Sequence, residues 1–250
     1  MCTLLVATSK IAGAELVVVA NRDERMARPS LPPQLWPAGF IAPRDELAHG
    51  TWLGINRHGV FVGITNRHLG PQDAARTSRG AIVVSALEEP SARQIHTKMA
   101  ALQAKSHNGF HLVYADEREV LATISDGEHL AQLSLGSGVH VVTERSFGAG
   151  DERARVRRAM AAWSRLGPRP GEHSLDVARL TGVLAEHDPT DPFSGTCLHL
   201  TNIDYATRSS MVLALGKDRR TMLWAEGAPC TTPFTAIDLS SLFETLNQRC

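Results

Sequence analysis

The pattern of apolar and polar residues begins with two short runs that are typical of β-strands. Residues 3–8 and 15–20 are rich in valine, leucine and threonine, and the loop between them contains a glycine. A second pair of runs, residues 52–56 and 60–65, flanks a turn at Gly59, where glycine can adopt a positive φ. The two pairs predict two antiparallel hairpins.

The segment between the hairpins, residues 28–50, contains five prolines. Proline lacks a backbone N–H and interrupts regular hydrogen bonding, so this segment is expected to be an irregular loop on the surface. Because loops at sheet ends frame ligand pockets, we expect residues 28–50 and 143–152 to border a binding site.

Downstream of the second hairpin, helices and strands follow in groups. Apolar residues at helical spacing predict helices over residues 81–88, 91–104, 153–165, 174–186 and 239–247. Short β-rich runs predict strands at residues 110–114, 120–124, 130–135, 139–143, 198–203, 209–215 and 221–226. Hairpins dominate this order, which indicates mainly antiparallel sheets with grouped helices. We find no linker or internal repeat and expect one α+β domain over residues 1–250.

Composition mainly removes classes of function. The chain has 26 Lys and Arg against 26 Asp and Glu, and this even balance argues against a nucleic-acid partner. No apolar run reaches the roughly 18 residues of a membrane span, and the first residues lack the pattern of a signal peptide, so a cytoplasmic location is expected. The four arginines within residues 153–158 predict a solvated helix face. Oligomeric state stays open, with a homo-oligomer among the alternatives.

Motifs exclude several catalytic classes. The chain has no GxSxG, GxxxxGK[ST], HExxH or GxGxxG motif, which argues against serine α/β-hydrolases, P-loop proteins, zincins and the common dinucleotide-binding fold. Its four cysteines, Cys2, Cys197, Cys230 and Cys250, lie far apart and form no CxxC pair. Neither a zinc knuckle nor a c-type haem attachment is therefore predicted, and we expect reduced thiols, no metal site and no cofactor.

The first hairpin gives Cys2 a distinctive set of neighbours. With the loop centred near residues 11–12, residue i faces about residue 23 − i, within one residue. Cys2 then lies opposite Asn21, with Arg22 and Asp23 just beyond the strand end. A thiol, an amide, a guanidinium and a carboxylate are expected to converge there, and the second hairpin brings Asn66 towards the same rim.

These groups acquire a chemical meaning once Met1 is removed. Cys2 then carries a free α-amine with a pKa of about 8, which can accept the thiol proton and generate a thiolate nucleophile. Asp23 would orient the ammonium, and asparagine N–H groups would stabilise an oxyanion. Two other interpretations stay open from the spacing alone: Cys2 as a small core residue, and residues 21–24 as a solvated, Asx-capped turn.

A family resemblance begins with Asn21-Arg22-Asp23-Glu24, which resembles the signature of the NRDE family, also called the transport and Golgi organisation protein 2 family. Further segments resemble that family in order along the chain: Met1-Cys2-Thr3, Arg44-Asp45, Gly50-Thr51-Trp52-Leu53-Gly54-Ile55-Asn56, Gly59 through Thr65-Asn66, Ser78-Arg79-Gly80, Asn108 through Val113 with Asp116, and Thr207-Arg208-Ser209-Ser210. The resemblance is dense over most of residues 1–125 and sparse afterwards.

The family is similar to the cysteine-type N-terminal nucleophile (Ntn) hydrolases, the group of penicillin V acylase and bile salt hydrolase. The resemblance implies a four-layer αββα sandwich of two antiparallel sheets covered by helices, which agrees with the element order. It implies Cys2 as nucleophile after loss of Met1, Asp23 as holder of the α-amine, Asn66 as the oxyanion amide and Arg208 as a late arginine near the nucleophile. The implied activity is hydrolysis or acyl transfer at an amide or other acyl bond of a small molecule.

The chain departs from the family pattern near the implied site. The early arginine of the acylases falls near Ala20, and Arg22 is expected to face the other way on its strand. A second asparagine is expected where the chain has Thr143-Glu144, and Glu144 adds negative charge where an oxyanion or a substrate carboxylate binds. The predicted substrate-binding residues are Asn21, Arg22, Trp52 and Glu144, although a tryptophan at position 52 also fits core packing.

A ligand carrier on the same fold is the competing hypothesis. Resemblance to family members that act in haem trafficking makes haem the leading ligand, with iron contacts expected from His49, His58, His68, His111, His199 or Cys2. Each lone histidine is also consistent with an ordinary surface or hydrogen-bonded role. Under either hypothesis the expected partner is a small molecule.

Overall fold

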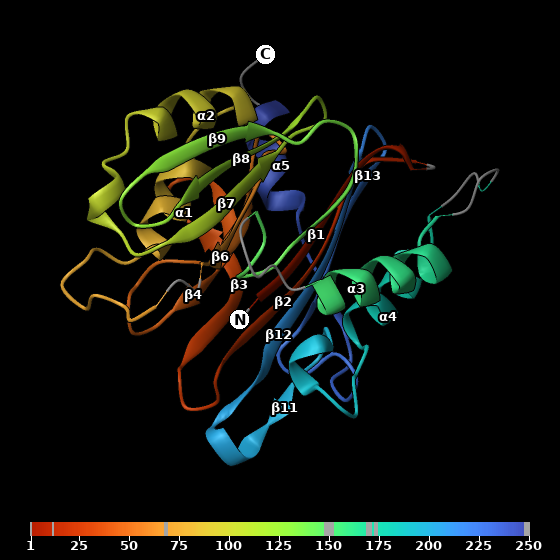
Figure 1. The fold of residues 1–250 in the computed structure, drawn as a ribbon. Coiled ribbons are helices and arrows are strands. Elements are labelled where there is room, and N and C mark those ends of the chain that lie inside the picture. Colours follow the sequence, from red (N-terminus) through yellow and green to blue (C-terminus); the bar gives the residue numbers. More distant parts are fainter. Residues whose placement is uncertain are drawn as a thin grey trace. The chain divides into compact units, whose positions relative to one another are not determined.

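The structure is a computed structural model that describes residues 2–11, 13–67, 70–147, 153–168, 172 and 175–247. The chain forms two compact units, each with its own antiparallel sheet (Figure 1). The first unit comprises Met1–Arg28 and Gly138–Ile237, and the second comprises Pro29–Ser137 and Asp238–Cys250. In the described part of the chain, every helix is too short or too polar to cross a membrane.

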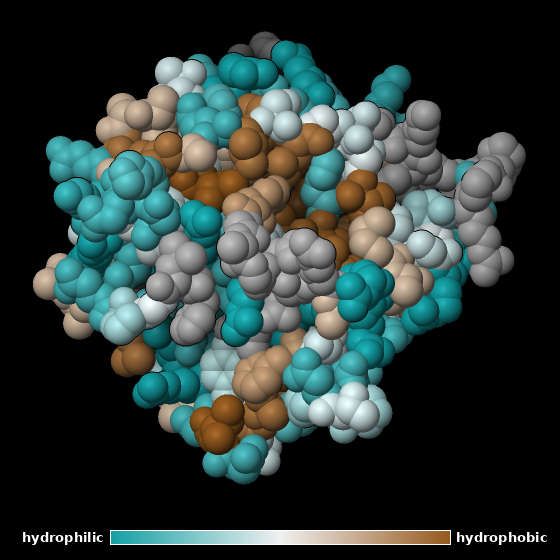
Figure 2. Space-filling view, viewed as in Figure 1, coloured by the Kyte–Doolittle hydropathy of each residue, from teal (hydrophilic) through white to brown (hydrophobic). Residues whose placement is uncertain are grey.

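The sheet of the first unit has the strand order β10-β1-β2-β12-β13-β14, with β11 paired to β12. Its strands are β1 (Cys2–Ile11), β2 (Ala14–Arg25), β10 (Gly138–Val142), β11 (His199–Leu200), β12 (Tyr205–Gly216), β13 (Arg219–Ala225) and β14 (Thr235–Ile237). Its helical segments are α3 (Arg153–Leu166), α4 (Thr181–Leu184) and the 3-10 turns η2 (Ala178–Leu180), η3 (Pro192–Ser194) and η4 (Thr201–Ile203). Figure 2 shows apolar side chains at the surface beside η4, where Ile203 is exposed.

Alternation along the strands explains which face of this sheet the helices cover. Leu5 on β1, Val17 and Val19 on β2 and Val212 on β12 form one core with apolar residues of the helical region such as Ala162. Successive side chains of a strand point to opposite faces. Odd-numbered residues of β1 and β2 therefore face the helices, and even-numbered residues face the other side of the sheet.

The second unit has a seven-stranded meander in chain order. Its strands are β3 (Ser30–Trp36), β4 (Phe40–Asp45), β5 (Leu53–Asn56), β6 (Phe61–Asn66), β7 (Phe110–Ala115), β8 (Val120–Ser125) and β9 (Leu130–Ser134). Its helical segments are α1 (Gly80–Leu87), α2 (Ala92–Ala100), η1 (Ala104–Ser106) and α5 (Ser240–Asn247). Buried residues of α1 and α2, including Val83 and Ile95, share one core with sheet residues such as Val62 and Leu112.

The predicted fold class, α+β with antiparallel sheets and grouped helices, is confirmed. Both expected hairpins are present as β1–β2 and β5–β6, and Gly59 adopts the positive φ of 76° that its turn requires. The helices expected at residues 81–88, 91–104 and 153–165 correspond to α1, α2 and α3. The expectation of one domain over residues 1–250 stays a prediction.

Two local expectations are wrong. Residues 28–50 do not form an irregular loop, because they contain β3 and β4. β3 is an edge strand in which the prolines at positions 32 and 33 lie at a register shift between Leu31 and Gln34, so their missing N–H groups interrupt no regular ladder. The helix expected over 174–186 is reduced, in the described residues, to η2 and α4, and β14 is a strand that the sequence did not predict.

Candidate active site

Cys2 begins β1, and its cross-strand neighbour on β2 is Arg22. Thr3 pairs with Asn21, so the expected pairing of Cys2 with Asn21 is off by one residue. Residues paired across strands share a face of the sheet. Cys2, which is half-buried, and Arg22, which is buried, therefore lie on the face away from the helices, and the expectation that Arg22 faces away from this position is wrong.

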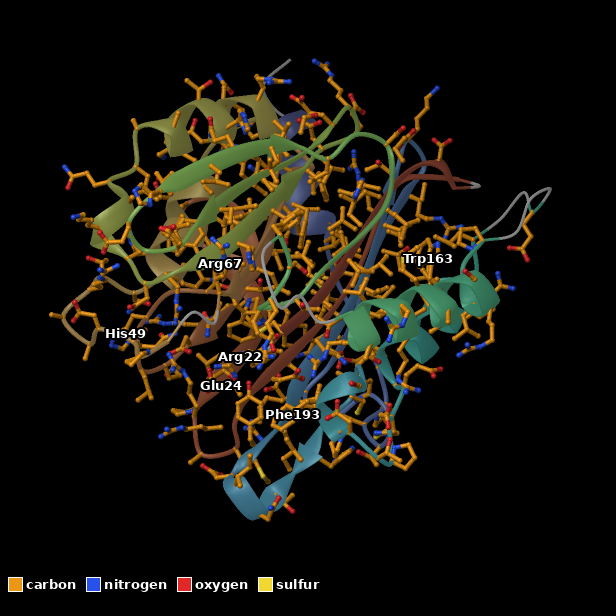
Figure 3. The ribbon with its side chains drawn as sticks, viewed as in Figure 1. Arg22, Glu24, His49, Arg67, Trp163 and Phe193 are labelled. Carbon is orange, nitrogen blue, oxygen red and sulfur yellow. The ribbon has the colours of Figure 1, made fainter. Side chains whose placement is uncertain are left out.

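Arg22 has an acidic neighbour two residues along the same strand. Its Nη2 lies 3.8 Å from Glu24 Oε2, and Arg28 Nη1 lies 3.7 Å from the same oxygen. Figure 3 shows Arg22 and Glu24 projecting from β2. The positive charge next to Cys2 is thus balanced in part by a half-buried carboxylate.

A β-bulge brings a second arginine to this corner. On β12, Thr207 pairs with Asp23 and Ser209 pairs with Arg22, so Arg208 is the extra residue between them. Arg208 is half-buried, and Ser209 is buried. Within the described part of the chain, Arg208 Nε and Ser209 Oγ are buried atoms that make no hydrogen bond. Buried polar atoms of this kind are rare and point to a bound group or water.

Glu144 follows β10, the strand that pairs with β1 on the side opposite β2. β10 runs antiparallel to β1, with Leu4 opposite Val142 as the last pair, and Glu144 lies two residues beyond that pair. Glu144 is 3% exposed and begins a turn in which the Thr143 N–H donates to Ser146 Oγ at 2.9 Å. A buried acidic residue therefore follows the strand that flanks β1 on one side, while Arg22 pairs with Cys2 on the other.

Burial raises the pKa of the Cys2 thiol above its ordinary value, and the negative charge of Asp23 acts in the same direction. The backbone N–H of Asp23 and the positive charge of Arg22 act in the opposite direction, but burial dominates the pKa. The residue is consequently a protonated thiol at neutral pH. It requires a base before it can act as a nucleophile.

Asp23 lies on the helix face, where it forms a buried ion pair with Arg155 of α3. Arg155 Nη1 lies 3.0 Å from Asp23 Oδ2 and donates to Thr3 Oγ1 at 3.2 Å, while Arg155 Nε donates to the carbonyl of Phe193 at 2.9 Å. Thr207 Oγ1 donates to Asp23 Oδ1 at 2.7 Å. Neither charged side chain is exposed. The carboxylate is therefore fixed from two sides.

Sequence reasoning missed Arg155, because the expectation of a solvated helix face over residues 153–158 is wrong there. Arg155, Ala159 and Ala162 are all buried, and their spacing of four and three residues forms one stripe along α3. Arg157 is exposed, and Arg158 pairs with Asp188. The two small apolar residues on the stripe are the signal that could have assigned Arg155 to the interior.

Asn21 is held in the same way on the helix face. Its Nδ2 donates to the carbonyls of Leu184 at 2.9 Å and Thr196 at 2.6 Å, and its Oδ1 accepts from Ser210 Oγ at 2.7 Å. Asn21 is 2% exposed. An amide has two N–H donors, and both are used here, which gives Asn21 a structural role.

The Asn21 and Asp23 side chains point to the face of the sheet opposite the Cys2 side chain, but the Asp23 charge and backbone N–H both act on the Cys2 thiol, so the expected convergence beside Cys2 stays a prediction. The two remaining candidates belong to the second unit. Asn66 is exposed at the end of β6, where it pairs with Phe110, and Trp52 is half-buried against that unit's core. Their proximity to Cys2 stays a prediction.

The candidate haem ligands occupy varied environments. His111 on β7 is fully buried, with its Nδ1 3.1 Å from Thr65 Oγ1. His49 and His58 are exposed in the second unit, and His199 is exposed on β11. His68 lies outside the described residues. Iron ligation by these histidines stays a prediction.

Solved structures define the class to which this fold belongs. An N-acylethanolamine-hydrolyzing acid amidase ortholog from Caenorhabditis elegans is 15% identical with a TM-score of 0.59, and the match covers 88% of this chain and 95% of that chain. Penicillin V acylase from Agrobacterium tumefaciens is 14% identical with a TM-score of 0.52, covering 97% and 87%. A variant of conjugated bile acid hydrolase from Clostridium perfringens is 11% identical with a TM-score of 0.59, covering 97% and 94%. The chain has the fold of the Ntn hydrolases.

The family follows from the sequence. The family model described as Transport and Golgi organisation 2 matches residues 1–227, and the chain belongs to this family. The transport and Golgi organization protein 2 homolog of Homo sapiens is 32% identical over 107 residues, and the homolog of Mus musculus is 29% identical over 106 residues. Each alignment covers 40% of this chain and 38% of the relative, so the chain matches less than half the length of these relatives.

Proposed function

We propose that the chain is a divergent N-terminal cysteine hydrolase or acyltransferase that acts on an amide or other acyl bond of a small molecule. Cys2 is the nucleophile, and it acts after Met1 is removed. The observation that carries this proposal is the corner around Cys2, where Arg22 lies directly opposite and the bulge at Arg208 follows on the next strand. The Ntn-hydrolase fold supports the same reaction class.

Removal of Met1 supplies the base that the thiol lacks. The new α-amine of Cys2 has a pKa of about 8, so a substantial part of it is neutral near pH 7 to 8 and can accept the thiol proton. The thiolate then attacks the acyl carbon, a C–S bond forms, and the C–N bond breaks as the leaving amine takes the proton. Water or a second amine attacks the thioester and regenerates the thiol.

Asp23 is the residue proposed to hold the α-amine. Its two oxygens accept hydrogen bonds from Arg155 and Thr207. Asp23 directly follows Arg22, the residue opposite Cys2, so it lies at the strand end where the α-amine forms. Because the Arg155 pair fixes the carboxylate, this contact needs no reorganisation.

The arginines suggest the type of substrate. Arg22 and Arg208 bring two positive charges to the corner, and Arg208 Nε and Ser209 Oγ are unpaired among the described residues. Such groups fit an anionic or strongly polar substituent next to the acyl bond, such as a carboxylate. Glu144 limits the net positive charge and favours a substrate that also carries a donor. Asn66 is proposed as the oxyanion donor and Trp52 as a substrate contact, as the family resemblance implies.

Intact-protein mass spectrometry before and after a limiting thiol reagent tests the proposal. We expect Met1 to be absent and Cys2 to be alkylated before the other cysteines. The matched control is a chain with one alanine inserted between Met1 and Cys2, which denies Cys2 a free α-amine and should slow alkylation to the rate of a buried thiol. A retained Met1, or equal alkylation of Cys2 in both chains, would refute the proposal.

The reaction itself is tested with a panel of N-acyl amino acids. We expect a thioester adduct on Cys2 with a mass that follows the acyl group, and its loss in Cys2→Ser. Arg208→Gln should raise KM more for substrates with a carboxylate than for neutral amides. Haem carriage is the alternative proposal, and a haem titration without a shift of the Soret band would argue against it.

A further inference from the structure

A second group of reactive side chains lies in the first unit, apart from the residues assigned to catalysis. It consists of His187 after α4, Cys197 and His199 at β11, and Cys230 in the loop between β13 and β14. One potential ligand atom from each residue lies within 4.8 Å of the others. Four chain positions separated by up to 43 residues thus present two thiols and two imidazoles to one point.

The distances within this cluster fit a tetrahedral metal site better than a disulfide. The sulfurs of Cys197 and Cys230 are 3.5 Å apart, whereas a disulfide bond is about 2.05 Å long. His199 Nε2 lies 3.7 Å from Cys197 Sγ and 3.0 Å from Cys230 Sγ. With Zn–S of about 2.3 Å and Zn–N of about 2.0 Å, the ligand atoms of a tetrahedral site lie about 3.3 to 3.8 Å apart.

The histidine orientation supports the same interpretation. His187 Nδ1 lies 3.1 Å from the carbonyl oxygen of Cys197. A carbonyl oxygen only accepts, so Nδ1 carries the proton and Nε2 carries the lone pair that a metal needs. Metal-binding histidines typically have such a partner on the second ring nitrogen. The rings of His187 and His199 are 5.4 Å apart between centroids, so the two imidazoles are neighbours.

We propose that His187, Cys197, His199 and Cys230 form a Cys2His2 site for a structural zinc ion. Thiolate and imidazole ligands together select zinc over the hard cations magnesium and calcium. Two Cys and two His complete the tetrahedral shell, which is the pattern of structural rather than catalytic zinc. Binding releases the two thiol protons to solvent, and no oxidant or reductant is involved.

The site has a structural task in this fold. Three of its ligands lie on the segment 187–199, which also contains the carbonyls of Phe193 and Thr196. These carbonyls accept hydrogen bonds from Arg155 and Asn21, the two residues that connect the segment to the helix face beside β2. A zinc ion that ties the segment to Cys230 therefore positions the network around Asp23. No sequence motif predicts this site, because the spacing His187-x9-Cys197-x-His199-x30-Cys230 is not that of a zinc finger.

Metal analysis of the full, untagged and reduced chain tests this proposal. We expect one zinc per chain after dialysis against micromolar zinc, and its loss in Cys230→Ser and His199→Asn. Both residues are exposed, so these variants are expected to fold even where Cys197→Ser does not. Cys2→Ser is the matched control: it also removes a thiol and should keep the zinc. Cobalt should give the strong sulfur-to-metal absorption of a tetrahedral thiolate site in the parent chain and not in Cys230→Ser.

Three results would overturn the proposal. The first is a reduced chain that binds no zinc. The second is equal zinc content in the parent chain and in Cys230→Ser. The third is an isolated chain two hydrogens lighter than its sequence mass, with Cys197 and Cys230 joined in one peptide, which would identify the pair as a disulfide. Removal of zinc by a chelator should in addition speed amide hydrogen exchange over residues 187–199. Because this test measures metal and not turnover, it is independent of the proposed hydrolase activity.

Discussion

Replacement of Arg155 by methionine tests whether the buried ion pair between Arg155 and Asp23 stabilises the helix face of the sheet. Methionine has a similar length but no charge, so Arg155→Met removes the partner of Asp23 without opening a large cavity. The Asp23 carboxylate stays buried and keeps the hydrogen bond from Thr207 at 2.7 Å. The Thr3 hydroxyl and the Phe193 carbonyl lose their contacts with the guanidinium as well.

The expected cost follows from the burial of both charges. Removing one partner of a buried ion pair leaves an uncompensated charge and destabilises a protein by about 3–5 kcal/mol. For a chain of this size such a loss lowers Tm by roughly 6–20 °C. Arg157→Met on the same helix changes the same residue type at an exposed position, and we expect an effect within about 0.5 kcal/mol.

Equilibrium urea unfolding of the parent chain, both single variants and the double variant Asp23→Asn with Arg155→Met measures this difference. The double variant removes both charges, so it should regain part of the stability that Arg155→Met loses. A loss below about 1 kcal/mol for Arg155→Met, or equal losses for Arg155→Met and Arg157→Met, would refute the claim that a buried ion pair fixes the Asp23 carboxylate.

Two further predictions concern other buried polar groups. Asn21→Ala removes the side-chain donor to the carbonyls of Leu184 and Thr196, so we expect the free energy of unfolding to fall by about 2 kcal/mol or more in urea unfolding. Asn202→Ala, at an exposed position, should leave the free energy of unfolding unchanged, and equal stability of the two variants would contradict this prediction. Burial raises the pKa of Tyr114 to about 12 from its ordinary value of 10.0, so the folded chain keeps a proton that the unfolded chain loses, and stability should fall as the pH rises from 10.0 to about 12. Tyr114→Phe should flatten that slope in urea unfolding, and an unchanged slope would count against it.

Most of the fold was predictable because its elements are encoded locally. The alternation in β1, β2, β5 and β6 and the helical spacing in α1, α2 and α3 each lie within one short segment. The failures fall where long-range contacts decide the structure. Pro32 and Pro33 are accepted in β3 because that strand is at a sheet edge, and edge position is a property of the whole sheet.

The candidate site was predictable only in part, for a similar reason. Cys2 and residues 21–23 of β2 could be brought together from one hairpin, but the side-chain faces depend on the register to a single residue. Arg155 reaches Asp23 across 132 positions of the chain, and the Cys2His2 cluster joins His187 to Cys230. No local spacing rule predicts contacts of that separation.

The buried network on the helix face also explains why Cys2 pairs with Arg22 across the strands. A slip of β2 by one residue would move the Asn21 and Asp23 side chains to the opposite face and turn Arg22 towards α3. The apolar residues of β2 do little to prevent such a slip, because Val17, Val18 and Val19 place valine on both faces of the strand and a shift by one residue still buries valine. The bonds from Arg155 to Asp23 and from Ser210 to Asn21 exist in one register alone. Fixing register is the best-attested role of buried polar groups. The network on the helix face therefore keeps Arg22 opposite Cys2, although the network itself lies on the other side of the sheet.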